Sequence, residues 1–292
     1  MVGLIVKAIS SFYYVDFENT IYECKARGNF RKMGVSPIVG DYVEFSLTDS
    51  SHGVIEEIKD RKNCLSRPVV ANIDKIVIVS SYSCPCPDTL IIDRLTAVAV
   101  YYGIEPVIVF NKSDTGDFSE YKRIYENAGF KTFVVSAKEN IGIDDLRTEI
   151  GKSFCAFAGN SGVGKSSIIN CLFGNLSLKT GEVSEKLGRG RHTTRHTELF
   201  KTPEGGYIAD TPGFSSFENE GGKYDFKIHL AECFPEFKDY LGNCRFTSCT
   251  HTCEKGCAVI EALSDGKIEP TRHQSYVALF EELKGVKEWK NN

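Results

Sequence analysis

The first 66 residues hold short runs in which apolar and polar positions alternate, with glycine-containing turns between several of them. This period of two is typical of strands with one buried face, and no helical period accompanies it. The runs cover residues 2–9, 12–17, 21–26, 41–46 and 53–58. Five short strands in about 65 residues suit a small barrel such as the OB-fold, whose loops and strand face often bind oligonucleotides. We therefore predict an N-terminal OB-fold β-barrel with an RNA-binding role over residues 1–66.

The pattern changes after the barrel region, where β-branched apolar runs alternate with amphipathic stretches. Residues 76–80 and 106–110 are predicted strands on either side of an amphipathic helix at 90–102, and further strands follow at 133–135 and 154–158. This alternation is typical of a parallel α/β sheet, in which ligand-binding loops lie at the C-terminal ends of the strands. We predict an α/β domain over residues 67–217.

The remaining residues, 218–292, have helical patterns near 226–234 and 274–284, on either side of a group of cysteines. The spacing Cys-x4-Cys-x-His-x5-Cys is formed by Cys244, Cys249, His251 and Cys257. Three thiolates and one imidazole make a standard tetrahedral zinc set, and four protein ligands leave no open position for catalysis. We predict a mostly helical domain with one structural Zn²⁺ ion. Cys253 is a spare thiol that could replace one ligand, although we expect it to lie outside the site.

Length and composition agree with a multidomain globular protein. The chain has 292 residues, of which 41% are hydrophobic and 25% are charged. No run approaches the roughly 20 apolar residues that a membrane-spanning helix needs, and the first residues fit a strand better than a signal peptide. Eleven cysteines are an odd number in a large chain without an export signal, which argues against a disulfide scaffold. We expect a cytoplasmic protein without membrane contact, and nothing in the sequence demands more than a monomer.

The net charge of −4 argues against indiscriminate binding of nucleic acid by the whole molecule, so any RNA contact must be local. Two basic segments are candidates, residues 25–32 and 189–196. In the first of them Phe30 lies among the cations, and it could stack on a base while the cations contact phosphates. The alternative for this segment is a solvated hairpin tip without a ligand.

A phosphate-binding loop follows the predicted strand at 154–158. Its sequence is Gly159-Asn160-Ser161-Gly162-Val163-Gly164-Lys165-Ser166, which matches Gly-x4-Gly-Lys-Ser between a strand and a helix. The glycines allow backbone N–H groups to point at the β-phosphate, and the helix that starts at Ser167 adds its N-terminal dipole. We expect Lys165 to bridge the β- and γ-phosphate oxygens and Ser166 to bind Mg²⁺.

Two further segments predict that the base is guanine. They are Asn111-Lys112-Ser113-Asp114 and Ser136-Ala137-Lys138. The Asp114 carboxylate can accept hydrogen bonds from guanine N1–H and the 2-amino group, and adenine has neither donor there. Sites that reject an analogue in this way can discriminate by about 10⁴ to 10⁵. Lys112 would cover the base and the Ala137 N–H would meet guanine O6, so the predicted ligands are GTP and GDP.

Two loops complete the predicted site. In Asp210-Thr211-Pro212-Gly213, the Asp210 carboxylate would hold Mg²⁺ through water and the Gly213 N–H would contact the γ-phosphate. In Arg191-His192-Thr193-Thr194, one threonine would close over the metal in the triphosphate state, and the sequence does not separate Thr193 from Thr194. The water-orienting glutamine of Ras-like enzymes is replaced by Phe214, which predicts slow intrinsic hydrolysis. His192 is our candidate substitute, and the alternatives are that it contacts RNA or only packs.

The order of these motifs differs from that of Ras-like proteins. Ras-like chains place the phosphate loop first and the base-reading motifs last, whereas here 111–114 and 136–138 precede 159–166. The α/β domain is therefore predicted to be a circularly permuted P-loop GTPase domain. Because the loop at 210–213 leads directly into the zinc-binding region, a nucleotide-dependent shift of this loop could tilt that region.

Taken together, these segments resemble the RsgA family (also called YjeQ or YloQ) of circularly permuted GTPases. The resemblance covers nearly the full length and rests on the motif order and on Val39-Gly40-Asp41-Tyr42-Val43, residues 188–194, residues 210–214, Cys244-Arg245-Phe246 and Cys257-Ala258-Val259. It implies a bacterial factor in late maturation of the small ribosomal subunit, which binds ribosomal RNA and hydrolyses GTP to GDP and phosphate faster on that particle. A histidine of the threonine loop has been implicated in hydrolysis in this family, and here that position is His192. Cys253 departs from the family pattern.

Three functions fit the sequence. The first is an enzyme, a GTPase that acts on the assembling small subunit. The second is a binding module in which nucleotide stabilises an RNA clamp and turnover is incidental, and the missing glutamine supports it. The third is a metal or redox sensor that uses the cysteine-rich region. We predict the first, because a barrel and a zinc module beside a GTPase without its own glutamine suit a switch that its partner completes.

Overall fold

The computed structural model describes residues 1–28, 30, 34–66, 68–82, 87–174, 197–210 and 223–286. Its contacts divide the chain into two compact units. The first unit consists of Met1–Lys75, Asp145–Phe157 and Ser166–Ser216, and the second consists of Ile76–Asp144, Ala158–Lys165 and Phe217–Asn292. The chain passes between the units several times, so neither is one continuous stretch of sequence.

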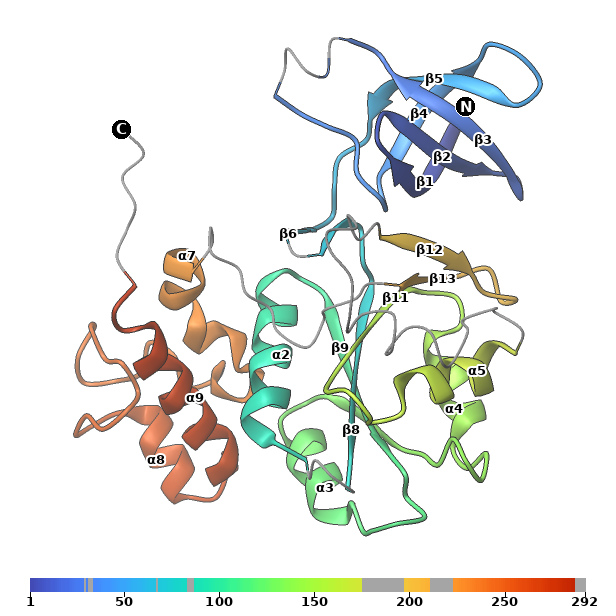
Figure 1. Ribbon diagram of the computed structural model, residues 1–292. Helices are drawn as coiled ribbons and strands as arrows, with labels where there is room; N and C mark the ends of the chain where they lie inside the picture. Colours follow the sequence, from blue (N-terminus) through green and yellow to red (C-terminus); the bar gives the residue numbers. More distant parts are fainter. Residues whose placement is uncertain are drawn as a thin grey trace. The chain divides into compact units, whose positions relative to one another are not determined.

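The N-terminal part of the first unit is a closed barrel of the strands β1–β5 (Figure 1). These strands are β1 (Val2–Ile9), β2 (Phe12–Phe17), β3 (Thr20–Ala26), β4 (Tyr42–Leu47) and β5 (His52–Ile58). β1 pairs with both β2 and β4, β2 pairs with β3, and β5 closes the ring by pairing with β3 and β4. The prediction of an OB-like barrel is confirmed, because alternating side chains such as Val15, Val43 and Ile55 fill its interior.

A buried ion pair fixes the turn that leads into β4. Asp41 is fully buried, and Arg61 donates to its two carboxylate oxygens from Nε at 2.7 Å and from Nη2 at 2.9 Å. Gly40 beside it has φ of +89°, and a Cβ there would lie 2.1 Å from the Ala71 carbonyl oxygen. Ala71 belongs to the short pair of strands β6 (Cys64–Ser66) and β7 (Val69–Ala71). Glycine is required here because any side chain would push the barrel away from this pair.

The barrel continues into the α/β sheet of the same unit. That sheet contains β11 (Phe154–Ala158), β12 (Glu198–Lys201) and β13 (Tyr207–Asp210), with β13 parallel to β11 and antiparallel to β12. The other edge of β12 pairs with barrel strand β1, where Lys7 and Glu198 are opposite each other and form a salt bridge of 2.9 Å. Lys201 Nζ and the Tyr207 hydroxyl both donate to Asp16 Oδ2 of β2, at 2.9 and 2.7 Å. Helices α4 (Ile143–Ile150) and α5 (Lys165–Phe173) belong mostly to this unit.

The second unit has a sheet with the strand order β10-β9-β8, formed by β8 (Lys75–Ser81), β9 (Glu105–Asn111) and β10 (Lys131–Val134). β9 and β10 are parallel, and the apolar run at 107–110 in β9 is fully buried, as strands covered on both faces require. The predicted helix at 90–102 is α2 (Thr89–Tyr101), which begins at Asp88 because its carboxylate accepts from the backbone N–H groups of Leu90 and Ile91. A second helix, α3 (Ser119–Asn127), follows β9.

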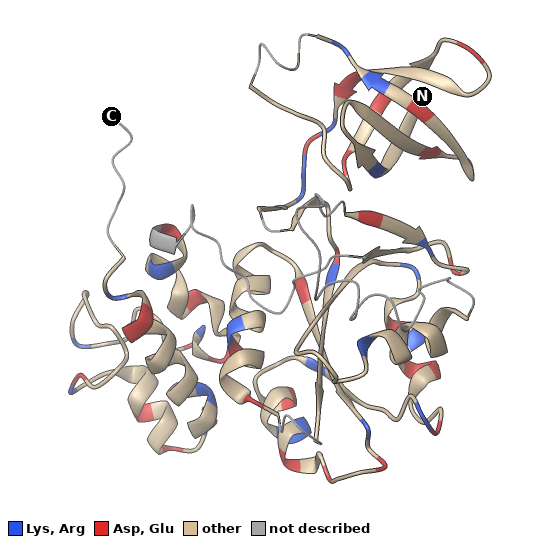
Figure 2. Cartoon of the chain, viewed as in Figure 1, with Lys and Arg blue, Asp and Glu red and all other residues tan. Residues whose placement is uncertain are grey.

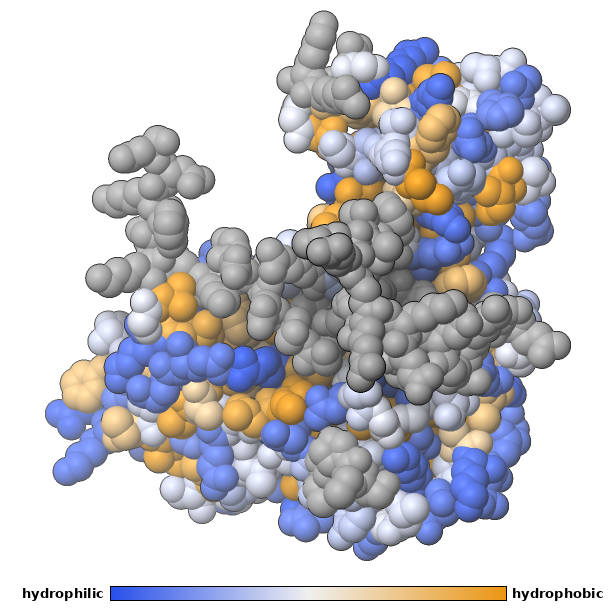
Figure 3. Space-filling view, viewed as in Figure 1, coloured by the Kyte–Doolittle hydropathy of each residue, from blue (hydrophilic) through white to orange (hydrophobic). Residues whose placement is uncertain are grey.

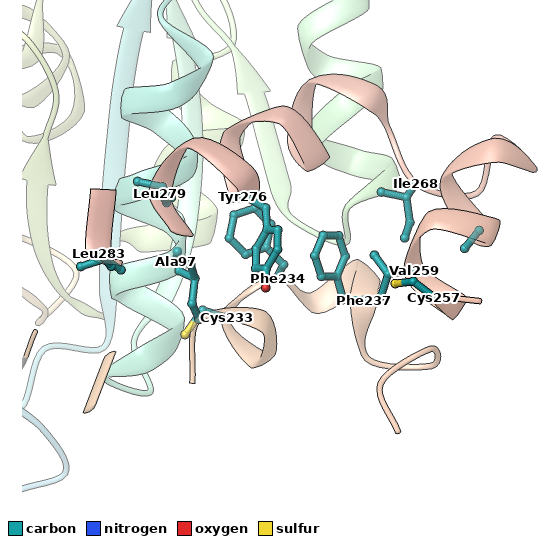
Figure 4. Packing of buried hydrophobic residues seen from close by; sticks show 12 residues of the cluster. Ala97, Cys233, Phe234, Phe237, Cys257, Val259, Ile268, Tyr276, Leu279 and Leu283 are labelled. Atoms are coloured by element: carbon teal, nitrogen blue, oxygen red, sulfur yellow. The ribbon is translucent and has the colours of Figure 1, made fainter. Parts of the chain in front are cut away.

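The C-terminal part of the second unit is mostly helical, as predicted. Its elements are α7 (Lys223–Ile228), two 3₁₀ turns η1 (Leu230–Cys233) and η2 (Pro235–Phe237), α8 (Ala258–Ser264) and α9 (Pro270–Leu283). The single helix expected near 226–234 is therefore divided after Ile228 into α7 and η1, and Pro235 follows this span in the first turn of η2. In Figure 4 the rings of Phe234, Phe237 and Tyr276 pack beside Leu279 of α9 and Ala97 of α2. This shared core joins the C-terminal helices to α2.

The surface carries both charges. Basic and acidic positions are interspersed along the described barrel strands and the C-terminal helices (Figure 2). Hydrophobic patches on the face drawn in Figure 3 are interrupted by hydrophilic side chains. None of the helices in the described residues is long and apolar enough to cross a membrane.

Candidate nucleotide site and metal centre

One side chain connects the loops that the sequence assigns to the nucleotide. Asn111 lies at the end of β9 and is 2% exposed. Its Nδ2 donates to the Val163 carbonyl oxygen at 2.9 Å, and its Oδ1 accepts from the Ala137 N–H at 3.1 Å. A Cβ on Gly164 would lie 2.2 Å from that Nδ2, so the phosphate loop needs glycine at this point. The structure thus brings 111–114, 136–138 and 158–165 together in the second unit, although they are far apart in sequence.

The predicted base-reading carboxylate is held by the neighbouring loop. The Ser136 hydroxyl donates to Asp114 Oδ1 at 2.7 Å, and Lys138 Nζ lies 4.0 Å from Oδ2. The hydrogen bond from Ser136 lowers the pKa of Asp114, so this side chain is ionised at neutral pH. Lys112, at φ of +65°, donates from Nζ to the Gly162 carbonyl oxygen at 2.9 Å. An anchored, ionised carboxylate can accept two N–H groups from one ligand edge, as guanine recognition requires.

The phosphate loop has the open backbone expected of it. Gly159, Gly162 and Gly164 have φ of +128°, +82° and +95°. A Cβ on Gly159 would lie 2.1 Å from the Val79 carbonyl oxygen of β8, so the loop starts tightly against that strand. Lys165 donates from Nζ to the carbonyl oxygens of Gly159 and Asn160 at 2.7 and 2.8 Å, and burial lowers its pKa. An ammonium group held at the loop in this way can exchange these carbonyl oxygens for phosphate oxygens.

Several predicted residues lie at or beyond the edge of the described chain. Ser166 and Ser167 are in the first turn of α5, and Asp210 is the last residue of β13. The Asp210 side chain and the residues His192, Thr193, Thr194, Gly213 and Phe214 lie outside the described residues. The same holds for the basic segment 189–196 and for Asn29, Arg31 and Lys32 of the other basic segment. Their roles stay predictions.

The four predicted zinc ligands converge in one place. The donor atoms of Cys244, Cys249, His251 and Cys257 all lie within 4.8 Å of one another. His251 Nδ1 is 3.5 Å from Cys244 Sγ and 3.4 Å from Cys257 Sγ, and the two sulfur atoms are 3.8 Å apart. With Zn–S bonds of about 2.3 Å and Zn–N bonds of about 2.0 Å, a tetrahedral ion separates two sulfur ligands by about 3.8 Å and sulfur from nitrogen by about 3.5 Å. The cluster therefore has the dimensions of a four-ligand metal site.

The protonation state of the cluster depends on whether a cation is bound. Burial raises the pKa of the Cys249 thiol to about 12 and raises that of Cys257, while burial lowers the pKa of His251. The environment by itself thus favours neutral thiols, and a bound metal ion supplies the charge that converts them to thiolates. Cys253 is exposed and is not among the four converging donors.

No sequence pattern predicted the side chains that support this cluster. Glu254 accepts from the backbone N–H groups of Thr250 and Thr252 at 2.7 and 3.0 Å. Burial alone would raise the pKa of Glu254, but hydrogen bonds from Thr250 and from loop amides lower it to about 2. From α9, His273 Nε2 bonds to the His251 carbonyl oxygen at 2.8 Å and the Tyr276 hydroxyl donates to that of Thr250 at 2.7 Å. The loop that carries the predicted ligand His251, residues 249–254, is thereby held by hydrogen bonds to its backbone; we call it the ligand loop.

Sequence comparison places these features among known proteins. The chain matches the family model of the RsgA GTPase over residues 58–220 and that of the RsgA N-terminal domain over residues 2–55. A protein of Ruminiclostridium cellulolyticum named Small ribosomal subunit biogenesis GTPase RsgA is 44% identical over 99% of this chain and 95% of its own length. A protein of the same name from Caldanaerobacter subterraneus is 44% identical over 97% of this chain and 95% of its own length.

Two solved structures resemble the chain over nearly their whole length. The crystal structure of YjeQ from Thermotoga maritima has a TM-score of 0.81 at 34% identity, covering 98% of this chain and 99% of that one. The crystal structure of YloQ, described as a circularly permuted GTPase, has a TM-score of 0.81 at 33% identity and covers 99% of this chain and 96% of that one.

Proposed function

The chain belongs to the RsgA GTPase family, and from this premise we propose that it hydrolyses GTP during late maturation of the small ribosomal subunit. The observation that carries the proposal is the Asn111 side chain, which bonds to both the phosphate loop and the loop at 136–138. Motifs in permuted order are thereby assembled into one nucleotide site. The relatives named for small ribosomal subunit biogenesis support the ribosomal part.

In this proposal the second unit reads the base and holds the phosphates. Asp114 accepts from guanine N1–H and the 2-amino group, with Ser136 and Lys138 keeping the carboxylate in place. Lys112 covers the base, and the Ala137 N–H, which bonds to Asn111 in this structure, is shared with guanine O6. The backbone N–H groups of residues 159–164 and the Lys165 ammonium group bind the phosphates. Ser166 and Asp210 would hold the Mg²⁺ ion, which neutralises charge on the phosphates when bound.

Hydrolysis is assigned to the loops beyond the described residues. We assign the orientation of the attacking water to His192, because Phe214 occupies the position of the usual glutamine. One of Thr193 and Thr194 closes over the metal, and the Gly213 N–H contacts the γ-phosphate. Contact with the small subunit would complete this catalytic arrangement, so turnover rises on the particle.

The flanking regions are assigned to binding and stability. We propose that residues 1–66 contact ribosomal RNA, that residues 67–217 are the GTPase domain, and that residues 218–292 form the zinc-binding domain. Zn²⁺ is the proposed ion of the cluster of Cys244, Cys249, His251 and Cys257, because three thiolates and one imidazole at tetrahedral spacing are a standard structural set for it. The protein would act as a monomer in the cytoplasm, where its partner is assembled.

The test is GTP turnover measured alone, with purified small subunits, and with large subunits and bulk RNA as controls. Stimulation by small subunits alone is the expected result, and it should be lost in His192→Ala while GTP binding is retained. Equal stimulation by bulk RNA would remove the ribosomal role. Unchanged turnover in every mixture, with tight GTP binding, would instead identify a binding module in which hydrolysis is incidental.

A further inference from the structure

Arg272 of α9 is a fully buried cation that belongs to none of the sites above. Its Nη1 donates to Asp93 Oδ1 of α2 at 2.6 Å and to the Thr96 hydroxyl at 3.2 Å. Its Nε donates to Glu236 Oε1 at 2.7 Å, and its guanidinium lies 4.6 Å from the centre of the Phe234 ring. Arg272 and Asp93 are both 0% exposed, so this contact between α2 and α9 is shielded from water.

Such a cluster holds its members in a defined geometry. Burial raises the pKa of Asp93, so the carboxylate depends on the adjacent guanidinium to stay ionised. Arginine can serve two carboxylates at once because its donors form a rigid planar fork. Removing one partner would leave an uncompensated buried charge, so α2 and α9 cannot separate here without a large cost.

The same helix α2 lines a small cavity beside the phosphate loop. Ile91, Ile92 and Leu95 of α2 line a small cavity together with Gly159 and Asn160. The cavity has a volume of about 10 Å³, which is room for about one water molecule. Because the cavity is this small, a displacement of α2 towards it would bring the α2 side chains against the start of the loop.

The next residues of α9 face the metal cluster. His273 directly follows Arg272 and bonds to the carbonyl oxygen of His251, a ligand that has φ of +58°. One turn further, Tyr276 donates to the carbonyl oxygen of Thr250. The first turns of α9 therefore touch the ligand loop on one side and α2 on the other, and the whole chain of contacts lies within the second unit.

We propose that Arg272 is a positioning residue that couples the Cys₃His centre to the phosphate loop through α2. The inference rests on the nucleotide and zinc sites proposed above. Because coupling between two binding sites is reciprocal, an intact metal centre tightens nucleotide binding and bound nucleotide tightens metal binding by the same factor. Couplings of this kind are typically about 5- to 150-fold.

The test measures both directions in the full chain. The affinity for a fluorescent GDP analogue is measured before and after zinc removal, and the affinity for zinc is measured with and without GDP, by equilibrium competition with a chromogenic chelator. The two quantities compared are the ratio of GDP affinities with and without zinc and the ratio of zinc affinities with and without GDP. Arg272→Lys keeps the buried positive charge but cannot serve Asp93 and Glu236 together, so both ratios should fall towards one. The matched control is Arg94→Gln, because Arg94 also joins α2 to α9, through Glu282 at 2.8 and 2.6 Å, but at the exposed surface. The control should keep the wild-type ratios.

The outcomes separate this inference from the proposed function. A wild-type chain that binds neither guanine nucleotide nor zinc would remove the proposed function itself. A wild-type chain that binds both, but binds zinc with the same affinity with and without GDP, would overturn the coupling and leave the GTPase assignment intact. Wild-type ratios in folded Arg272→Lys would show that Arg272 only anchors the helices. Should that variant not fold, Asp93→Asn weakens the same contact from α2 and is judged by the same ratios.

Discussion

Guanine selectivity should depend on the charge of Asp114, and Asp114→Asn removes that charge with almost no change in size. In the structure Oδ1 accepts from Ser136, which leaves the carboxylate's remaining acceptor positions for the ligand. Guanine would use two of them, and hydrogen bonds to a charged group contribute about 1.5–3 kcal/mol each. An asparagine amide in this place would lose both charge-assisted hydrogen bonds. Its NH₂ group could also face guanine N1–H or the 2-amino group, which are donors and cannot accept a hydrogen bond from it. The expected loss is about 3–6 kcal/mol, or about 10²- to 10⁴-fold in affinity for GDP.

Equilibrium titration of fluorescent GDP and XDP checks this expectation. Xanthine carries an oxygen where guanine has its 2-amino group, so Asp114→Asn should bind XDP better than the wild type does. The matched control is Asp117→Asn, because Asp117 is a nearby exposed carboxylate whose pKa is also lowered by a serine hydroxyl, that of Ser119. The control should bind GDP like the wild type. An Asp114→Asn protein that still prefers GDP, or a control that loses as much affinity, would refute the assignment of the base.

Three further predictions concern the same two sites. Gly159→Ala should weaken nucleotide binding about 5- to 150-fold in the same titration, because forcing a side chain into packed structure costs about 1–3 kcal/mol. Gly129→Ala, also at positive φ but with open space around it, should not weaken binding. Cys257→Ser should lose its zinc, measured by elemental mass spectrometry, and should unfold the C-terminal helices, because structural zinc contributes folding energy. Cys253→Ser, which changes an exposed cysteine outside the cluster, should retain its zinc. A lowered pKa means that the carboxylate of Asp114 contributes above that pKa and is lost only as the pH falls through it. Because the terminal phosphate of a nucleoside diphosphate itself titrates at about pH 6, the quantity to follow is the ratio of GDP affinity to ADP affinity. This ratio should stay level between about pH 8 and pH 5, and a decline of the ratio starting at about pH 6 would contradict the prediction.

Sequence patterns predicted the elements whose signal is local. Alternation located the five barrel strands to within one residue at each end, and glycine-rich or Cys/His spacing located the phosphate loop and the metal ligands. The short helix α8 and the short strand β12 were not predicted, because four to seven residues carry too little periodicity. The apolar pattern at 226–234 did not predict the division into α7 and η1, and Pro235 lies too late in the chain to cause it.

Contacts between distant residues were beyond the sequence. Asn111 was predicted to bind nucleotide, but its two bonds to Val163 and Ala137 follow only from the folded loops. Arg272 looks like an ordinary surface charge within its helix, and only the approach of Asp93, 179 positions away, makes it a buried ion. Buried polar partners of this kind depend on tertiary packing and leave no periodic trace in the sequence.

The pairing of β12 with β1 means that the barrel also protects a strand edge. If an evolving or engineered chain lost the barrel, β12 would present unpaired N–H and C=O groups, which invite association with other chains. Glu198 and Lys201 would lose Lys7 and Asp16, the barrel partners that balance their charges. A shortened chain would therefore need a new cover for β12, so the barrel is retained for solubility as well as for any contact that it makes with RNA.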